Sequence, residues 1–249
     1  MAESEGEWLP PPAEVILGAS EVHVWRASLD TSAKQIQQLA RLLAPDERAR
    51  ADRFHFERDR LRFIAGRARL RLILSRYTGI AASHLHFSYS TYGKPSLVAG
   101  LADDLCFNVS HAECVALCAF TRSGAIGVDV ERVRTDVDIE RLAAQFFSAR
   151  ENDALRRVPD ALKPTAFYNC WTRKEAYVKA HGLGLSLPLD QFDVSLVPDE
   201  PARLLASRIQ SDEVEQWSLI ALRPDEGFVA ALDLAPPAHQ VKTWLCPDL

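Results

Sequence analysis

The stretch GAIGVDVERV, residues 124–133, decides how the rest of this chain is interpreted. From Ile126 to Val130 every second residue is apolar, which is the pattern of a β-strand with one buried face. Asp129 and Glu131 then project from the other face, roughly 6.5 to 7 Å apart along the backbone. Two carboxylates so placed can share a hard divalent cation such as Mg²⁺, whose other ligands are commonly substrate phosphate and water. The polar outer face of an ordinary edge strand would give the same pattern, so both interpretations stay open.

A second informative segment is FYNCWTRKEAYVK (167–179), which has the pattern of a helix with a buried side. Glu175 and Lys179 are four residues apart and share one face, whereas Lys174 is turned about 100° away. On an exposed helix such a Glu–Lys pair contributes only ~0.3 to 0.5 kcal/mol and has no functional meaning. The glycine-rich GLGLSLP (182–188) follows directly and predicts a helix end with backbone suited to close approach of a ligand.

Outward from these segments, strands and helices continue on both sides of Gly124. We expect strands at 21–29, 85–90, 113–120, 192–197, 215–222 and 227–234, and helices near 34–43, 56–76, 138–156 and 165–181. The chain therefore predicts two halves, residues 1–124 and 125–249, each with strands and one long helix.

The composition is that of a soluble globular protein, since 47% of the 249 residues are apolar and 25% are charged. No run approaches the ~20 apolar residues of a membrane helix, and the acidic, proline-rich N-terminus is unlike a secretory signal. Five cysteines without a CxxC pair argue against a disulfide framework and a thiolate zinc site. We expect a cytoplasmic protein without membrane contact.

Positive charge is concentrated in one segment. Between Arg41 and Arg76 there are 11 Arg and 5 carboxylates, a local charge of +6, although the whole chain carries −5. Proteins that grip a nucleic acid backbone over many contacts are usually basic overall. A small polyphosphate ligand therefore fits better than nucleic acid.

Two shorter motifs carry polar groups suited to such a ligand. Lys94 follows a turn glycine in YGKPSL (92–97), where its ammonium can meet phosphate as a compact charge. Ser110 and His111 lie at the end of an expected strand in FNVSH (107–111). A Ser–His pair without an orienting acid or a GxSxG motif is usually only a hydrogen-bonded pair, so hydrolase chemistry is disfavoured.

Taken together, the motifs resemble the 4′-phosphopantetheinyl transferases of the surfactin-synthetase type over roughly residues 44–195. The resemblance rests on the order and spacing of YGKPSL, FNVSHAE, IGVDVER, FFSARE and WTRKEAYVKAHGLGLSLPL. It implies an α+β, sandwich-like fold with two pseudo-twofold-related halves, each a small, mostly antiparallel sheet packed with a long helix. It also implies a monomer that transfers 4′-phosphopantetheine from coenzyme A to a serine of an apo acyl- or peptidyl-carrier protein, releasing adenosine 3′,5′-bisphosphate.

By this resemblance Asp129, Glu131 and Glu175 bind Mg²⁺, or Mn²⁺ in its place. Glu175 activates the carrier serine, directly or through water, and Glu151 of FFSARE is a second carboxylate for that step. The expected coenzyme A contacts are Lys94 and His111 on phosphates, Lys174 and Lys179 on the pyrophosphate side, Ser110, and Arg50 and Arg62 near the 3′-phosphate. Glu47 stands where some relatives have Lys, so that one phosphate contact is absent or is made by Arg48.

Carrier proteins are generally acidic around their modified serine, so the carrier is expected to meet basic and apolar groups. The segment 132–151 contains four Arg together with Phe146 and Phe147. An ordinary core helix with solvated arginines is the alternative interpretation of this segment.

Two other function classes remain. The carboxylates would also serve a different Mg²⁺-dependent phosphoryl or pyrophosphate hydrolase, which needs no carrier protein. A non-catalytic coenzyme A or carrier-binding protein could keep the fold, although a pure binder has no need of three converging carboxylates.

Overall fold

The computed structural model describes residues 7–182, 184–209, 213–235 and 240–248. The helices are α1 (Ala33–Ala40), α2 (Pro45–Ala51), α3 (Glu57–Thr78), α4 (Ile139–Phe146), α5 (Ala149–Arg157), α6 (Lys163–His181) and α7 (Glu213–Gln216). The strands are β1 (Glu21–Ser28), β2 (Phe87–Tyr89), β3 (Pro95–Leu97), β4 (Cys106–Ala112), β5 (Val115–Thr121), β6 (Ala125–Arg132), β7 (Phe192–Val194), β8 (Leu204–Ser207), β9 (Ser218–Leu222), β10 (Phe228–Ala235) and β11 (Gln240–Leu245).

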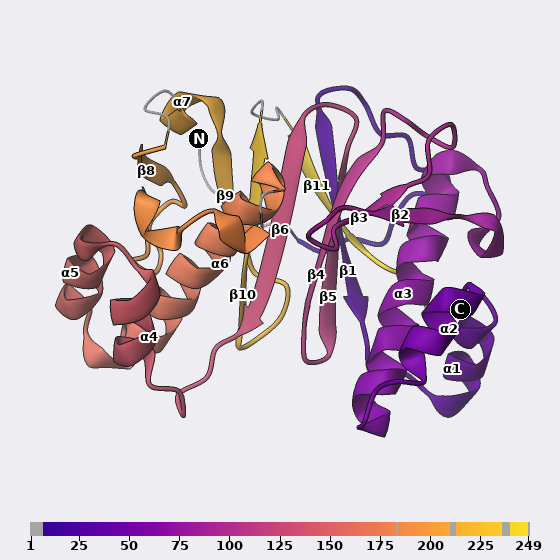
Figure 1. Ribbon diagram of the computed structural model, residues 1–249, viewed down its shortest axis with the longest axis horizontal. Helices are drawn as coiled ribbons and strands as arrows, with labels where there is room; N and C mark the ends of the chain where they lie inside the picture. Colours follow the sequence, from indigo (N-terminus) through magenta and orange to yellow (C-terminus); the bar gives the residue numbers. More distant parts are fainter. Residues whose placement is uncertain (1–6, 183, 210–212, 236–239, 249) are drawn as a thin grey trace.

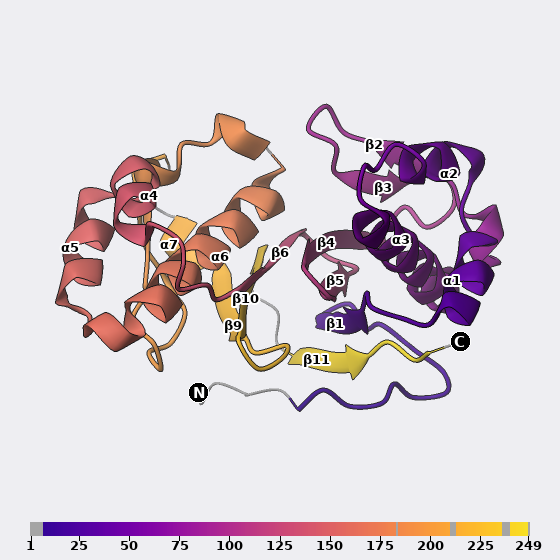
Figure 2. The same cartoon turned by 90° about the horizontal axis from the view of Figure 1, so that it is seen from below.

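Two sheets lie at the centre of the molecule, and the helices cover their outer faces (Figures 1 and 2). One sheet has the strand order β11-β1-β5-β4 and the other has β6-β10-β9. Apolar side chains between the sheets form a shared core, with Val24 and Leu117 from the first and Val128 and Leu232 from the second. This arrangement confirms the predicted α+β sandwich with a small, mostly antiparallel sheet and a long helix in each half.

The long helix of the N-terminal half, α3, is buried on more than one face. Ile73 and Leu74 pack toward the sheet, while Ile64 and Ala65 contact the residues around α1. The first helix, α1, is capped by Ser32, whose side chain accepts a hydrogen bond from the Gln35 amide.

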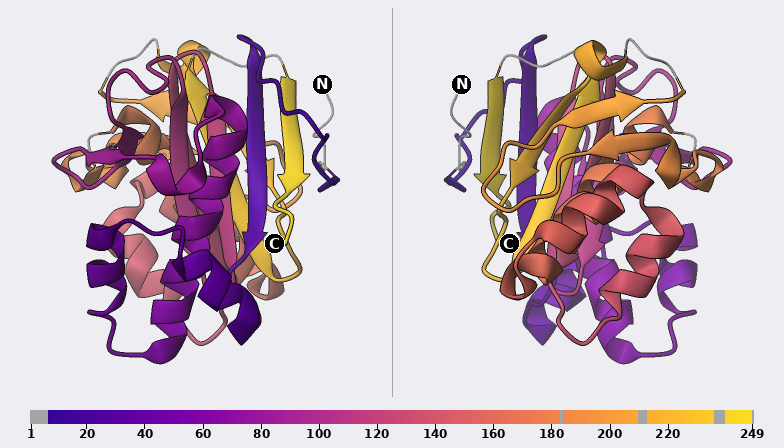
Figure 3. Two further views of the ribbon diagram at one scale, coloured as in Figure 1. Left: turned by 90° about the vertical axis from the view of Figure 1, so that its right-hand side faces the viewer. Right: turned by 90° about the vertical axis from the view of Figure 1, so that its left-hand side faces the viewer.

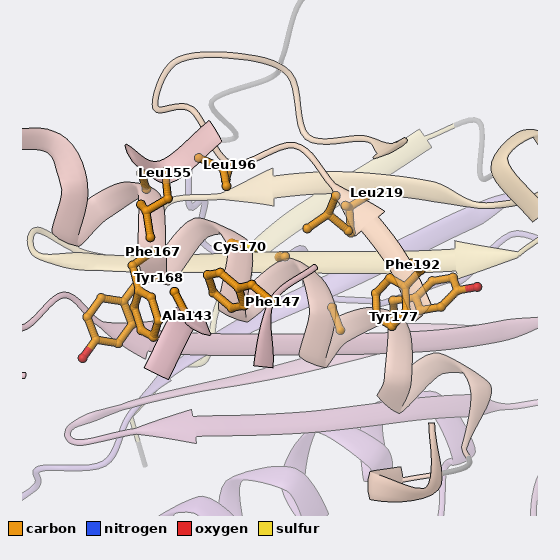
Figure 4. Close-up of a cluster of buried hydrophobic side chains, with 14 of the residues drawn as sticks. Ala143, Phe147, Leu155, Phe167, Tyr168, Cys170, Tyr177, Phe192, Leu196 and Leu219 are labelled. Carbon is orange, nitrogen blue, oxygen red and sulfur yellow. The ribbon is translucent and has the colours of Figure 1, made fainter. Parts of the chain in front are cut away.

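The long helix of the C-terminal half, α6, packs through aromatic side chains (Figure 4). The ring of Phe167 stacks on Phe147 with centroids 5.2 Å apart, and Tyr177 lies 4.4 Å from Phe192. Phe147 is therefore a core residue and is not available as an apolar anchor for a carrier protein. Phe146, which is partly buried, packs against Trp171 in the same core.

The last strand returns to the N-terminal half, which the sequence did not predict. β11 pairs in parallel with β1 from Glu21 opposite Gln240 to Arg26 opposite Leu245, and Figure 3 shows the two strands side by side. The predicted C-terminal half, 125–249, therefore contains a segment that lies in the other sheet. Its position covers one edge of β1, which would otherwise expose unpaired backbone groups.

None of the helices in the described ranges is long and apolar enough to cross a membrane.

Candidate active site

The strand β6 and the helix α6 approach each other unusually closely, and this contact brings the predicted carboxylates together. A methyl group added at Gly127 would lie 2.0 Å from the Ala176 carbonyl oxygen and 2.5 Å from the Ala180 nitrogen. Only a glycine leaves room for the helix backbone here. The predicted alternation holds, so Asp129 and Glu131 face α6, which contributes Glu175 and Lys179.

Asp129 is the most enclosed of the three carboxylates. Its Oδ1 accepts hydrogen bonds from the Ser110 hydroxyl at 2.8 Å and from the Lys179 ammonium at 2.6 Å. Lys179 also donates to Ser110 at 3.0 Å, so Ser110, Asp129 and Lys179 form a closed triangle across the two halves. The second oxygen, Oδ2, is buried and has no hydrogen-bond partner among the residues that the structure describes.

Glu131 and Glu175 are half-buried and feel the charge of Asp129. Burial and, next, the neighbouring Asp129 carboxylate raise the pKa of Glu131 to about 7. The same two causes raise the pKa of Glu175, while the Lys179 ammonium opposes the shift. The three carboxylates thus share a region near the Lys179 ammonium, and the negative charge of Asp129 disfavours the ionisation of Glu131 and Glu175.

This donor set fits a hard divalent cation. It consists of carboxylate oxygens, including the unpartnered Asp129 Oδ2, and their mutual repulsion would be relieved by positive charge. In the part of the chain that the structure describes, no three His, Cys, Asp or Glu side chains lie close enough together to form a preassembled metal cage.

A cavity of about 530 Å³ lies beside this region in the N-terminal half. Arg50, Arg62, Arg67 and His111 line it together with Phe63. Arg50 is exposed and lies over the Phe63 ring at 5.2 Å. His111 projects from the end of β4, and burial followed by the Lys179 charge lowers its pKa.

Arg62 is less available than the sequence suggested. Its guanidinium binds both oxygens of Asp30, with Nε to Oδ1 at 2.8 Å and Nη2 to Oδ2 at 3.0 Å. Both donors on that edge are already used, so Arg62 would have to exchange this partner to hold a phosphate.

The comparisons with known proteins agree on one family. The chain is 43% identical to the 4′-phosphopantetheinyl transferase HetI of Nostoc sp. (strain PCC 7120) over 238 residues, which is 95% of this chain and 97% of HetI. A model described as 4′-phosphopantetheinyl transferase, N-terminal, matches residues 25–122. A model of the 4′-phosphopantetheinyl transferase superfamily matches residues 125–233.

The chain belongs to the 4′-phosphopantetheinyl transferase superfamily. It is also 31% identical to the transferase Sfp of Bacillus subtilis (strain 168), with 78% of this chain and 88% of Sfp covered. An L-aminoadipate-semialdehyde dehydrogenase-phosphopantetheinyl transferase of Xenopus laevis is 29% identical, with 80% of this chain and 70% of that protein covered.

Two predicted site residues of this transferase lie in the core of the C-terminal half, away from the cavity lined by Arg50. Glu151 and Lys174 are almost completely buried and form an ion pair at 2.8 Å. Lys174 also donates to the backbone carbonyls of Leu189 and Phe192, and Glu151 accepts from the amide of Val194. Every charged group here already has partners, so this position favours a structural role for the pair, and their ligand and proton-transfer roles stay predictions.

Lys94 of the transferase is directed at backbone carbonyls. Its ammonium donates to the backbone carbonyl of Lys179 at 2.8 Å and to that of Ile126 at 3.2 Å. Burial lowers the pKa of this ammonium. In this arrangement Lys94 connects the β2–β3 hairpin to the C-terminal half and makes no contact with the cavity around Arg50.

Glu47, the departure from the family pattern, also points inward. It is buried and binds Arg71 at 2.7 Å and Arg67 at 3.4 Å. Glu47 therefore does not take the place of a surface lysine that would contact phosphate. Arg48 donates to the carbonyls of Leu43 and Arg41, so it would have to leave these partners to take over a ligand contact.

Sequence reasoning missed Gly127 and Asn108. A glycine inside a strand is a known sign of close backbone approach, so IGVDV contained a usable signal for Gly127. Asn108 is a buried amide between apolar neighbours in FNVSH, and its oxygen accepts a hydrogen bond from Val128 across the two sheets at 2.9 Å.

Proposed function

We propose that this transferase moves the 4′-phosphopantetheine group of coenzyme A to a serine hydroxyl of an apo acyl- or peptidyl-carrier protein. The main support is the placement of Asp129, Glu131 and Glu175 on the facing elements β6 and α6, near the Lys179 ammonium and beside a cavity lined by Arg50 and His111. Carboxylates for a cation, an ammonium for the pyrophosphate, and a guanidinium with an imidazole donor for a further phosphate match the charges of coenzyme A.

Asp129, Glu131 and Glu175 would hold Mg²⁺ or Mn²⁺ in this proposal. When bound, the ion supplies charge stabilisation to the pyrophosphate and to the group that leaves from it.

The chain's own residues then bind and orient the substrate. Lys179 donates to Ser110, Asp129 and the Val128 carbonyl, so its ammonium is held beside the carboxylates and would exchange one of these acceptors for a pyrophosphate oxygen. Arg50 and His111 line the adjoining cavity and would hold the 3′-phosphate through charge-assisted hydrogen bonds.

Glu175 would accept the proton of the carrier serine, directly or through one water. Its place on α6, opposite Asp129 on β6, puts this carboxylate beside the expected position of the pyrophosphate. The serine oxygen forms a bond to the phosphorus that carries the pantetheine arm. The bond from that phosphorus to the adenosine half breaks, and adenosine 3′,5′-bisphosphate leaves.

Intact mass spectrometry of an apo-carrier protein incubated with the transferase, coenzyme A and Mg²⁺ tests this proposal. Addition of one phosphopantetheine mass is expected, and Glu175→Gln should abolish most of it. Coenzyme A cleavage without a mass change on any carrier would contradict the proposal and favour a hydrolase. Binding without any reaction would favour a non-catalytic protein.

A further inference from the structure

The two sheets meet at an edge where no β-ladder joins them. β4 ends one sheet and β6 ends the other, and β6 pairs along its length only with β10 among the described strands. β4 and β6 nevertheless lie next to each other. Their register is therefore not fixed by a series of backbone hydrogen bonds, as it is between β4 and β5.

Side chains bind the free backbone groups on this edge of β6. The Asn108 side-chain oxygen accepts from the Val128 amide at 2.9 Å, and the Lys94 ammonium donates to the Ile126 carbonyl at 3.2 Å. Asn108 is only 4% exposed, so no solvent can readily replace its hydrogen bond. A buried amide left without an acceptor costs about 1–3 kcal/mol.

The alternation in β4 explains why the asparagine faces β6. Phe107 and Val109 pack on the α3 side of the sheet, so Asn108 and Ser110 project toward the other sheet. Ser110 is the residue that meets Asp129 at 2.8 Å. The strand β4 thus contacts the β6 backbone through Asn108 and, two residues later, a carboxylate of the candidate site through Ser110.

We propose that Asn108 is a positioning residue that fixes β4 against β6 and thereby sets Ser110 and His111 relative to Asp129. This inference rests on the proposed function, in which residues of β4 and of β6 lie on opposite sides of one substrate. Asn108 acts through the Val128 amide and has no contact with the reacting groups. An alanine there removes the acceptor, and an aspartate would add a fourth carboxylate beside Asp129.

The test compares Asn108→Ala with wild type and with Ile73→Val. The control removes one methyl group from the core behind β1, at an expected cost of about 0.5–1.5 kcal/mol, and leaves the β4–β6 edge unchanged. Two quantities are measured well below the melting temperature: amide hydrogen exchange at Val128, and steady-state kinetics for coenzyme A and for the carrier.

For Asn108→Ala we expect faster exchange at Val128, while amides in the β6–β10 ladder stay protected. The kcat/KM for coenzyme A should fall about tenfold below that of Ile73→Val, since tenfold corresponds to about 1.4 kcal/mol, in the range of one hydrogen bond. The KM for the carrier should stay within about twofold, because the lost bond acts on coenzyme A alignment.

An unchanged exchange rate at Val128 would overturn the proposal, and so would kcat/KM equal to that of Ile73→Val. If the alanine variant is insoluble, Asn108→Ser is judged by the same two measurements. Failure of the proposed function is separate, because then wild type itself would modify no carrier protein.

Discussion

At the residue scale, the three carboxylates of the candidate site differ in how their charge is compensated. Asp129 has both Ser110 and Lys179 on one oxygen, whereas burial and like charge raise the pKa of Glu131 and Glu175. This difference assigns separate tasks. Asp129 is held by the Lys179 ammonium and the Ser110 hydroxyl and anchors the site, while the raised pKa of Glu175 makes it the readier of the two to take up a proton in the metal-free protein.

Replacement of single carboxylates should abolish turnover without unfolding the protein. Glu175→Gln and Asp129→Ala each remove one oxygen ligand facing the pyrophosphate, for which a loss of ~10²-fold or more in kcat is expected. The rate of carrier modification and the thermal midpoint should be measured together. A near wild-type rate in either variant, with the fold intact, would exclude that residue from the site.

The stability of the metal-free protein should depend on pH through Glu131. Its pKa in the folded state, about 7, lies above the ordinary value of 4.5, so the folded state binds the proton more tightly. Stability is then fully present at low pH and is lost as the pH rises between these two values, by at most ~3 kcal/mol.

Mg²⁺ should restore the stability that is lost at higher pH, because its charge takes the place of the proton on Glu131. The thermal midpoint measured with Mg²⁺ and with a chelator should differ more at about pH 8 than at about pH 5. In Glu131→Gln the difference should shrink at the higher pH. An equal effect of Mg²⁺ at both pH values would contradict this role of Glu131.

At the element scale, the site depends on how closely α6 approaches β6. Gly127→Ala would place a methyl group 2.0 Å from the Ala176 carbonyl oxygen, and backbone cannot move aside cheaply. The helix must shift, and with it Glu175 and Lys179. We expect a loss of stability of about 2 kcal/mol or more and a proportionally larger loss of activity.

Gly66→Ala is the matched control for this prediction. A methyl group at Gly66 meets only the end of the Leu29 side chain, at 3.3 Å, and alanine favours a helix interior. Its thermal midpoint should be unchanged or raised. An equally mild effect of Gly127→Ala would show that the close approach of α6 and β6 is not required.

The same scale shows what the sequence could and could not predict. Alternation placed Asp129 and Glu131 on one face of a strand, and helical spacing placed Glu175 with Lys179, because both periods are local. The pairing of Glu151 with Lys174 was not predictable, since it depends on two helices that meet only in the folded core. β11 was missed for the same reason, because its partner β1 lies more than two hundred residues away.

At the scale of the whole molecule, two facing sheets with helices outside place a cavity of one half next to the carboxylates of the other. In the proposed reaction, the serine of the carrier protein must reach Glu175 from outside this assembly. Arg141 and Arg150 are exposed on α4 and α5, whereas Phe147 belongs to the core. The two arginines of the predicted docking segment are thus available to a carrier protein, whereas Phe147 is not.

Reversal of these two charges tests where the carrier docks. In Arg141→Glu with Arg150→Glu, we expect a several-fold higher KM for an acidic carrier and a weaker dependence of that KM on salt, because exposed charges act mainly on the encounter rate. Coenzyme A affinity should not change. Parallel loss of coenzyme A binding, or unaltered carrier kinetics, would place docking elsewhere.

The most direct test of the whole account is a crystal structure of the protein with coenzyme A and Mn²⁺, in which anomalous scattering locates the ion. The account predicts the ion among Asp129, Glu131 and Glu175, the pyrophosphate against Lys179, and the 3′-phosphate in the cavity lined by Arg50 and His111. An ion bound away from these carboxylates, or coenzyme A bound outside the junction of the two halves, would contradict it.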